Sequence, residues 1–309
     1  LSVEAGDDAG NWSTPFDVTL TLNNVVDPTI NGNAITPYNA SGGNTLTGTS
    51  NVDTIVGDVG NDRIILNGGA DQVNGGAGDD TFVLSISEFN TGDRKFIQGG
   101  TGDDTLEVQF ATDGVMSSAE FAERYQSIES LALVGTGAVR SVDLTLDEAA
   151  QQSGISQVVA DDNISLDVDF EGYTSGVTVQ TGVEADTVRA TDHADTIVGG
   201  GGNDSIDAKA GNDLIQFEIV ADMAKASIDG GSGTDTVKLL TNGQTVGDAA
   251  FSRIVANSVE KIVLADGDNK ITLASNAEAA LNNNASIETG EGHDLIDVSG
   301  YNDDVMRSV

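Results

Sequence analysis

The stretch Gly75-Gly76-Ala77-Gly78-Asp79-Asp80-Thr81-Phe82-Val83 decides the fold of this chain. It fits the nine-residue pattern G-G-x-G-x-D-x-U-x at every position, where U is a large apolar residue. It is the last of five such units that follow one another without a break over residues 39–83. Counting back by nines places Val73, Ile64, Ile55 and Leu46 at the eighth position. The same count places Asp71, Asp62, Asp53 and Asn44 at the sixth.

Each position of the unit has a physical task. Glycines at positions one, two and four let the backbone adopt positive φ and turn tightly, which leaves main-chain carbonyls free to point at one spot. The aspartate at position six adds a hard anionic oxygen, the kind of ligand that Ca²⁺ prefers. The apolar residue at position eight lies on a short strand and points inward. Two units make one coil, so turns two units apart stack at the inter-strand spacing of roughly 4.8 Å.

This pattern resembles the RTX (repeats-in-toxin, haemolysin-type calcium-binding) family. The resemblance implies an all-β fold, a parallel β-roll or β-helix that holds several calcium ions between stacked turns. The pattern returns at residues 99–106, as four phased units over residues 181–216, and as single units at residues 230–238 and 289–297. We therefore expect calcium coils along much of the chain, with short helical insertions between them.

The predicted calcium ligands are of two kinds. The carboxylates at position six are Asp53, Asp62, Asp71, Asp80, Asp104, Asp186, Asp195, Asp204, Asp213, Asp235 and Asp294. The turn glycines are Gly57, Gly60, Gly69, Gly76, Gly78, Gly100, Gly102, Gly200, Gly202, Gly211, Gly231, Gly233 and Gly292.

Stacking of every second unit predicts which carboxylates face each other across neighbouring coils. The expected pairs are Asp62 with Asp80, Asp53 with Asp71, Asp186 with Asp204, and Asp195 with Asp213. The spacing from Asp80 to Asp104, and that from Asp213 to Asp235, are longer than two units. Each of these longer spacings predicts a coil with a short bulging insertion.

Some turns depart from the pattern, and we expect their sites to be weaker. Position four is Asn51, Glu184 or His193 in three units, and the turn at residues 208–211 lacks two glycines. Lys95 occupies a position where aspartate is expected. A flexible linker rich in Gly and Asp is the alternative interpretation of such a composition. The apolar residue at every eighth position argues against that alternative.

Charge and composition restrict the function further. The chain has 309 residues, a formal net charge of −37 and no cysteine. Such a charge excludes nucleic acid as a partner and disfavours an anionic membrane surface, because like charges repel. Packed carboxylates oppose compaction until cations bind, so metal binding and folding should be coupled. Without disulfides, an extracellular protein needs another link, and calcium can provide it. No apolar run reaches the roughly 18 residues of a membrane span.

The N-terminal residues 1–30 are expected to differ from the rest. Residues 16–22 alternate apolar and polar side chains, which predicts a half-buried strand. Residues 16–28 resemble the closing strand of bacterial cadherin-like or immunoglobulin-like repeats, which would make residues 1–30 the end of an upstream β-sandwich. An edge strand on the roll itself is the alternative. Because Leu1-Ser2-Val3-Glu4 is neither an initiator methionine nor a signal peptide, we expect a piece of a longer polypeptide.

A second periodicity of about 130 residues predicts two related modules, residues 31–180 and 181–309. Residues 121–133 align with residues 251–263, and each segment follows a G-G-x-G turn. A short helix should follow each segment, starting with the capping boxes Thr145…Glu148 and Ser275…Glu278. Alternation over residues 164–170 predicts a strand in a coil that continues without calcium.

The sequence lacks a catalytic set, so we predict that this segment is not an enzyme. Neither H-E-x-x-H nor G-x-S-x-G occurs, and both histidines, His193 and His293, lie inside calcium turns. The carboxylate pair Asp161 and Asp162 has the composition of a glycosidase dyad but belongs to a polar turn before a strand.

The duplicated module favours a calcium-stabilised extracellular structural or adhesive segment of a bacterial surface. It would be part of an S-layer subunit, a surface filament or an RTX adhesin, and type I secretion would export it. The expected partners are further copies of the chain or the cell surface and its matrix, with polysaccharide as a weaker candidate. The alternative is a calcium-dependent folding and secretion module of a secreted enzyme or toxin whose catalytic part lies outside this chain.

Overall fold

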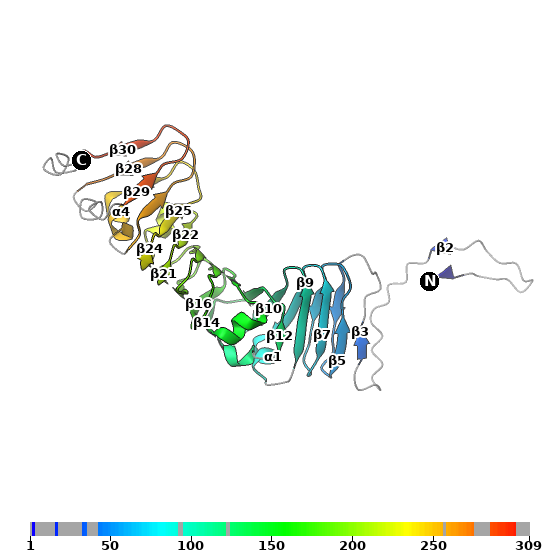
Figure 1. The fold of residues 1–309 in the computed structure, drawn as a ribbon. Coiled ribbons are helices and arrows are strands. Elements are labelled where there is room, and N and C mark those ends of the chain that lie inside the picture. The colour runs from blue at the N-terminus through cyan, green and yellow to red at the C-terminus, as the bar shows by residue number, and fades with distance from the viewer. Residues whose placement is uncertain are drawn as a thin grey trace, which may run out of the picture.

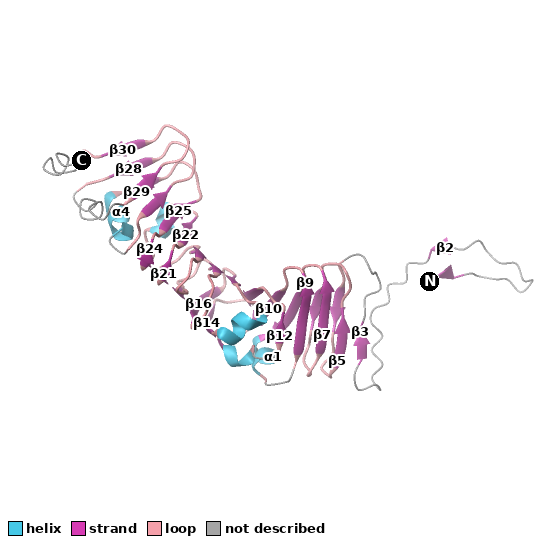
Figure 2. Ribbon diagram, in the orientation of Figure 1, coloured by secondary structure: helices cyan, strands magenta, loops and turns pink. Residues whose placement is uncertain are grey.

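The chain winds into an elongated, curved β-solenoid, with its N-terminal and C-terminal coils at opposite ends (Figures 1 and 2). The computed structural model describes residues 43–91, 95–121, 124–255, 258–274 and 285–300, together with three short strands nearer the N-terminus. Among the described strands, every pairing from β3 (Asn33–Ile35) onward is parallel. The predicted all-β parallel architecture is confirmed.

One face of the solenoid is a single twelve-stranded sheet, in which strands from successive coils are neighbours. Its strands are β4 (Thr45–Thr47), β6 (Arg63–Ile65), β8 (Thr81–Ser85), β10 (Thr105–Phe110), β13 (Ser130–Gly135), β15 (Gln157–Ala160), β17 (Thr178–Gln180), β19 (Thr196–Val198), β22 (Leu214–Phe217), β25 (Thr236–Leu239), β27 (Lys261–Val263) and β29 (Ser286–Glu288). The sheet passes residue 180 without a break. The two predicted modules, which stay a prediction from the sequence repeat, therefore share one solenoid.

The opposite face is divided into three sheets. The first contains β3, β5 (Asp53–Val56), β7 (Gln72–Ala77), β9 (Phe96–Thr101) and β12 (Tyr125–Gln126). The second contains β11 (Gly114–Ser117), β14 (Arg140–Leu146), β16 (Ile164–Phe170), β18 (Thr187–Arg189), β20 (Ser205–Asp207) and β23 (Ser227–Asp229). The third contains β26 (Thr245–Val246), β28 (Lys270–Thr272) and β30 (Leu295–Asp297), and the short strands β21 (Ala210–Gly211) and β24 (Ser232–Gly233) pair separately. The strand predicted over residues 164–170 is confirmed as β16.

The coils change length along the solenoid. In the large sheet, coils of two nine-residue units join β4 to β6, β6 to β8, β17 to β19 and β19 to β22. The predicted two-unit coil is thus confirmed in both blocks of phased units. All the other steps along this sheet are longer, as the registers of its remaining strand pairs show. The coils therefore widen after each block, which is the structural form of the longer periodicity.

Short helices fill the wider coils. They are α1 (Ile86–Asn90), the 3₁₀ helix η1 (Ser118–Glu120), α2 (Glu148–Ser153), α3 (Val220–Met223) and α4 (Asp248–Val255). The insertion predicted between Asp80 and Asp104 is α1, and the one predicted between Asp213 and Asp235 is α3.

The predicted capping box at Thr145 is wrong. Strand β14 continues through Thr145, which pairs with Asp169 of β16, so its backbone is extended there. The cap of α2 is Asp147, whose side chain accepts a hydrogen bond from the N–H of Ala149. A capping box is present instead at Ser85 and Glu88 of α1. The one predicted at Ser275 and Glu278 lies outside the described residues.

The core runs along the solenoid axis and follows the alternation of each strand. The eighth-position residues Ile55, Ile64 and Phe82 are fully buried, as the repeat predicts. In the wider coils the core becomes aromatic: the ring of Phe89 lies 5.3 Å from that of Phe121 and 5.8 Å from that of Tyr125. Aromatic side chains thus fill the extra cross-section that the longer coils enclose.

Little of the N-terminal prediction can be compared with the structure. Strand β1 (Ser2–Val3) pairs antiparallel with β2 (Phe16–Asp17). The rest of the strand predicted over residues 16–22, and the sandwich proposed for residues 1–30, lie outside the described residues. None of the described helices has the length and apolar character needed to cross a membrane.

Candidate metal centre

The position-six residues form two rows along the solenoid, because each coil contributes one turn before each of its two faces. The first row stands directly before strands of the twelve-stranded sheet and contains Asp62, Asp80, Asp104, Asp195, Asp213 and Asp235. The second row stands at or directly before strands of the opposite face and contains Asp53, Asp71, Asp186, Asp204 and Asp294. The structure thus brings all the predicted aspartates into these two rows.

Neighbours in a row are joined by a hydrogen bond from main chain to side chain. The N–H of Asp62 donates to Oδ1 of Asp80 (2.8 Å), and that of Asp80 donates to Oδ1 of Asp104 (2.8 Å). The same bond joins Asp53 to Asp71, Asp186 to Asp204, Asp195 to Asp213, and Asp213 to Asp235 at 2.8–3.0 Å. The residues predicted to face each other are therefore direct neighbours, and the rows continue across the two coils that contain α1 and α3.

The second oxygen of most of these carboxylates is buried without a donor. The orphaned oxygens are Oδ2 of Asp71, Asp80, Asp104, Asp186, Asp204, Asp213 and Asp235. None of these seven residues is more than 3% exposed. A buried charged oxygen without a partner is costly, so it calls for a cation or a proton.

Main-chain carbonyls face the same space as these oxygens, and glycine keeps that space open. A Cβ added to Gly75 would lie 2.6 Å from the carbonyl oxygen of Gly99 in the next coil and closer still to Oδ2 of Asp80. A Cβ added to Gly57 would lie 2.6 Å from Oδ2 of Asp62 and closer still to the carbonyl oxygen of Gly75. A side chain at Gly57 or Gly75 would therefore fill the space between the two coils.

The turn that contains Asn269 has its own hydrogen-bond donor at position six. Asn269 occupies position six, and its Nδ2 donates to the carbonyl oxygens of Ala265 (2.8 Å), Gly267 (3.0 Å) and Thr289 (2.8 Å). Three carbonyls from two coils thus converge on one donor. In turns where an aspartate occupies the position of Asn269, the side chain cannot donate hydrogen bonds to such carbonyls. The carboxylate and carbonyl oxygens then form a set of hard ligands that suits Ca²⁺.

The carboxylates alone do not complete a site. In the parts of the chain that the structure describes, no three side chains of His, Asp or Glu gather around one point. A bound ion would therefore take a carboxylate from the row and the rest of its ligands from main-chain carbonyls of the turn and of the next coil.

Burial raises the pKa of these aspartates. The pKa of Asp80 and of Asp104 rises to about 6, and that of Asp204 and of Asp213 to about 7, because desolvation disfavours the charged form and row neighbours repel it. The main-chain N–H bonds oppose this rise in pKa but do not cancel it. Protons therefore compete with calcium for these carboxylates as the pH falls below neutral.

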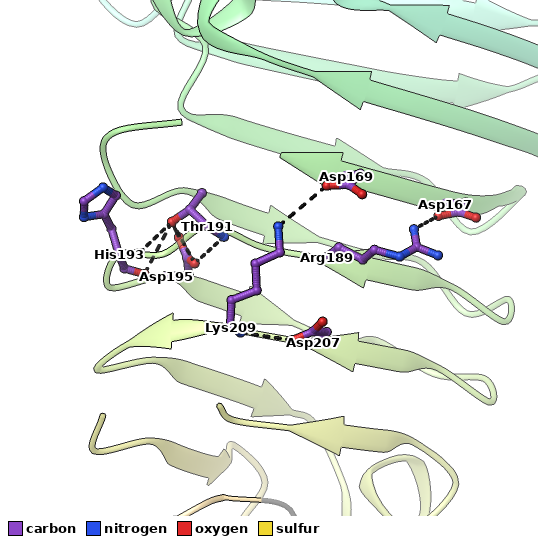
Figure 3. Close-up of polar contacts among 8 residues, drawn as sticks. All are labelled: Asp167, Asp169, Arg189, Thr191, His193, Asp195, Asp207 and Lys209. Carbon is purple, nitrogen blue, oxygen red and sulfur yellow. Dashed lines mark hydrogen bonds and ion pairs between the residues drawn. The ribbon is translucent and has the colours of Figure 1, made fainter. Parts of the chain in front are cut away.

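In two turns a threonine donates hydrogen bonds to the aspartate, although Oδ1 of Asp53 stays buried without a donor. The hydroxyl of Thr191 lies 2.9 Å from Oδ1 and 3.0 Å from Oδ2 of Asp195, and its N–H donates to Oδ2 at 2.9 Å (Figure 3). Thr49 binds Oδ2 of Asp53 in the same way, through its N–H and its hydroxyl. These donors were not predicted from the sequence, although threonine at position two of the unit was the available signal. The weaker calcium binding expected of these two units stays a prediction, and the threonine donors would compete with a cation for the carboxylates.

Lys95 ends the second row of the first block. Its side chain is 2% exposed, and its Nζ donates to the carbonyl oxygen of Gly69 at 2.6 Å. Its charge also opposes the rise in the pKa of Asp71, which burial raises to about 6. An ammonium group thus binds a carbonyl of the turn of Asp71, at the place in the row where the pattern would put an aspartate.

Most of the predicted turn glycines have the left-handed φ that the pattern requires. They are Gly69, Gly76, Gly78, Gly100, Gly102, Gly200, Gly202, Gly211, Gly231, Gly233 and Gly292. Gly57 and Gly60 do not. Gly57 is required instead for close approach to the next coil, and Gly60 packs against Gly78.

The fold and its rows define a parallel β-roll with calcium turns. Consistent with this, the chain matches the profile of the RTX calcium-binding nonapeptide repeat in four copies, over residues 41–82, 96–108 and 181–215. No curated protein and no solved structure matches the chain. The matched copies and the solenoid together fit an RTX repeat protein, whose nonapeptide repeats bind calcium and whose repeat number implies several ions.

Proposed function

We propose that this chain is a calcium-stabilised structural or adhesive segment of an extracellular bacterial protein, such as an S-layer subunit, a surface filament or an RTX adhesin. The observation that carries the proposal is the unbroken twelve-stranded sheet together with the rows of carboxylates beside the two faces of the solenoid. Each cation in such a row links one coil to the next, so calcium stiffens the two blocks of nonapeptide coils. An elongated body of this kind suits a spacer or a building unit.

The surface of the described residues supports a structural role. An open hollow of about 530 Å³ beside α1 is lined in part by Asn90, Asp113 and Asp143, and one of about 490 Å³ in part by Asp222 and Lys225. Neither lining contains a histidine. No catalytic family is identified, and a solenoid of RTX repeats is typically a structural or non-catalytic module.

The carboxylates Asp161 and Asp162 do not support a glycosidase. Oδ1 of Asp161 accepts the N–H of Asn163, and its Oδ2 accepts the N–H of Gly135 in the preceding coil. Asp161 is therefore bound as a turn residue, with both oxygens already occupied.

Charge on the outer face favours contacts through divalent ions. On this face Arg189 of β18 meets Asp167 of β16 at 2.6 Å, and Lys209, which follows β20, meets Asp169 of β16 at 3.6 Å (Figure 3). Basic residues are few, 13 against 50 acidic ones, so most acidic side chains have no basic partner available. Contacts between copies, or with an acidic matrix, would therefore need calcium as a bridge.

A second candidate is a folding and secretion module of a secreted enzyme or toxin. RTX repeats are typical of secreted proteins, and the orphaned carboxylates favour a chain that folds only where calcium is abundant. Under this alternative the segment would fold in calcium without associating, and type I secretion would serve both candidates.

The proposal is tested by comparing the chain in chelator and in millimolar calcium. Circular dichroism should report a calcium-dependent gain of β structure, and light scattering a calcium-dependent increase in mass. A gain of structure without any increase in mass would favour the folding module. Identical signals in the two conditions would contradict both candidates.

A further inference from the structure

The first row of carboxylates continues beyond the nonapeptide units. The register of β10 with β13 pairs Thr105 with Ser130, which places Glu129 opposite Asp104. The N–H of Asp104 donates to Oε2 of Glu129 at 2.8 Å. Glu129 thus accepts the N–H of Asp104, just as Asp104 accepts the N–H of Asp80, although Glu129 does not lie in a nonapeptide unit.

The same arrangement occurs again at the corresponding place after the second block. There the N–H of Asp235 donates to Oε2 of Glu260 at 2.9 Å, and the register pairs Thr236 with Lys261. The sequence separation between aspartate and glutamate is the same in both pairs. Each glutamate also follows a serine, Ser127 or Ser258, with one residue between them. These are the places where the row continues past the nonapeptide unit of Asp104 and that of Asp235.

The two serines supply the carbonyl that a nonapeptide unit would supply. Ser127 has φ 51° and Ser258 has φ 62°, both in the left-handed region. A Cβ added to Gly99 would collide with the carbonyl oxygen of Ser127 and with Oδ2 of Asp104. Between two nonapeptide units, Gly75 faces the carbonyl oxygen of Gly99 in the same manner. The serine carbonyl therefore takes the place of the position-one carbonyl.

An unsatisfied oxygen faces this space in both copies. Asp104 and Asp235 are fully buried, and Oδ2 of each has no hydrogen-bond donor. A Cβ added to Gly230 would approach Oδ2 of Asp235 within 2.8 Å and the carbonyl oxygen of Ser258 more closely. An orphaned carboxylate oxygen and a main-chain carbonyl thus meet around one small space, twice in one chain, and the glutamate carboxylate is hydrogen-bonded to the main chain of the same aspartate.

We propose that Asp104, the carbonyl of Ser127 and the carboxylate of Glu129 hold a divalent cation of the calcium type, and that Asp235, Ser258 and Glu260 hold a second one. These ions close the first row after Asp104 and again after Asp235. Their binding depends on the calcium chemistry of the repeats and not on the extracellular structural role. Glu129 and Glu260 are therefore ligands that the nonapeptide pattern does not reveal.

Replacement of each glutamate by glutamine separates a ligand from a simple hydrogen-bond acceptor. The amide oxygen of glutamine still accepts the N–H of the aspartate, but the negative charge is lost. The variants Glu129→Gln, Glu260→Gln and the double variant should be titrated with calcium, and the bound ions counted by native mass spectrometry. Glu171→Gln makes the same chemical change at an exposed residue away from the row and serves as the control.

We expect each single variant to bind one ion fewer than the wild-type chain, the double variant two fewer, and the control the same number. An unchanged ion count and unchanged affinities in both single variants would overturn the proposal. Circular dichroism in saturating calcium checks folding, and because the site occurs twice, misfolding of one variant leaves the other as a test. If the ion counts did not change, the wild-type chain would still need calcium for its structure. Failure of this proposal is therefore distinguishable from failure of the proposed function.

Discussion

Gly75 allows a sharp test of the cation space between coils. Its φ lies outside the left-handed region, so the substitution Gly75→Ala introduces no backbone strain of that kind. The new methyl carbon would lie 2.6 Å from the carbonyl oxygen of Gly99 and even closer to Oδ2 of Asp80. Atoms do not approach so closely, so either Asp80 or the next coil must move. We expect the variant to lose the ion between the coils of Asp80 and Asp104.

The size of the effect follows from what Asp80 gives up. If its carboxylate turns away, Oδ1 loses the 2.8 Å bond from the N–H of Asp62. A hydrogen bond to a charged group contributes about 1.5–3 kcal/mol, and overpacking adds a cost of about 1–3 kcal/mol. Together these terms predict that the free energy of unfolding falls by about 2.5–6 kcal/mol.

Gly201→Ala is the matched control, because Gly201 also belongs to a nonapeptide turn and also has an ordinary φ. Its added Cβ would meet its nearest atom, the Cα of Val183, at 3.6 Å, which is normal contact. The loss of a glycine from the unfolded chain should then stabilise the protein by about 0–1 kcal/mol. Urea unfolding in millimolar calcium, followed by circular dichroism, measures both variants. Equal unfolding free energies and equal ion counts for the two would refute the explanation.

Two further predictions concern the charge at position six. Burial raises the pKa of Asp204 and Asp213 from 3.8 to about 7, so the folded calcium-free protein binds these protons more tightly than the unfolded chain. The stability of the calcium-free protein should therefore fall as pH rises from about 4 to 7. Circular dichroism of the calcium-free protein should then show more structure at pH 5 than at pH 8. More structure at pH 8 than at pH 5 would contradict the burial of these two aspartates. In the second prediction, Asn269→Asp removes the amide that three carbonyls bind and should add one calcium ion by native mass spectrometry. Asn242→Asp is its control, and an unchanged count in Asn269→Asp would show that those carbonyls do not form a calcium cradle.

The sequence predicted the repeating part of the structure because one physical rule governs every unit there. The nine-residue phase places Ile64 and Phe82 in the core and makes Asp62 and Asp80 neighbours, and the structure confirms both. The phase also survives the longer step to Asp104, because the insertion bulges out as α1 and leaves the strands paired. A short-range pattern with a fixed step can therefore be extrapolated along a solenoid.

Features that depend on contacts between distant coils were not predictable in this way. The capping box expected at Thr145 failed because β14 extends to pair with β16, and a tertiary ladder overrode the local signal. Asn269 satisfies its turn partly through a hydrogen bond to Thr289 of the next coil, whose geometry is set only after that coil closes. Glu129 joins the row through a step in the chain that no repeat unit marks.

Metal and aromatic core stabilise different parts of the same solenoid. The two-unit coils enclose aliphatic side chains such as Ile55 and Ile197, and a small cross-section buries too little apolar surface to offset the repulsion of its carboxylates. In the wider coils, Phe89, Phe121 and Tyr125 form a cluster with ring centroids 5.3–5.8 Å apart. Such a cluster buries far more apolar surface per coil. Removal of calcium should therefore melt the narrow blocks first, because their turns hold orphaned carboxylates and their cores have the least apolar surface to compensate.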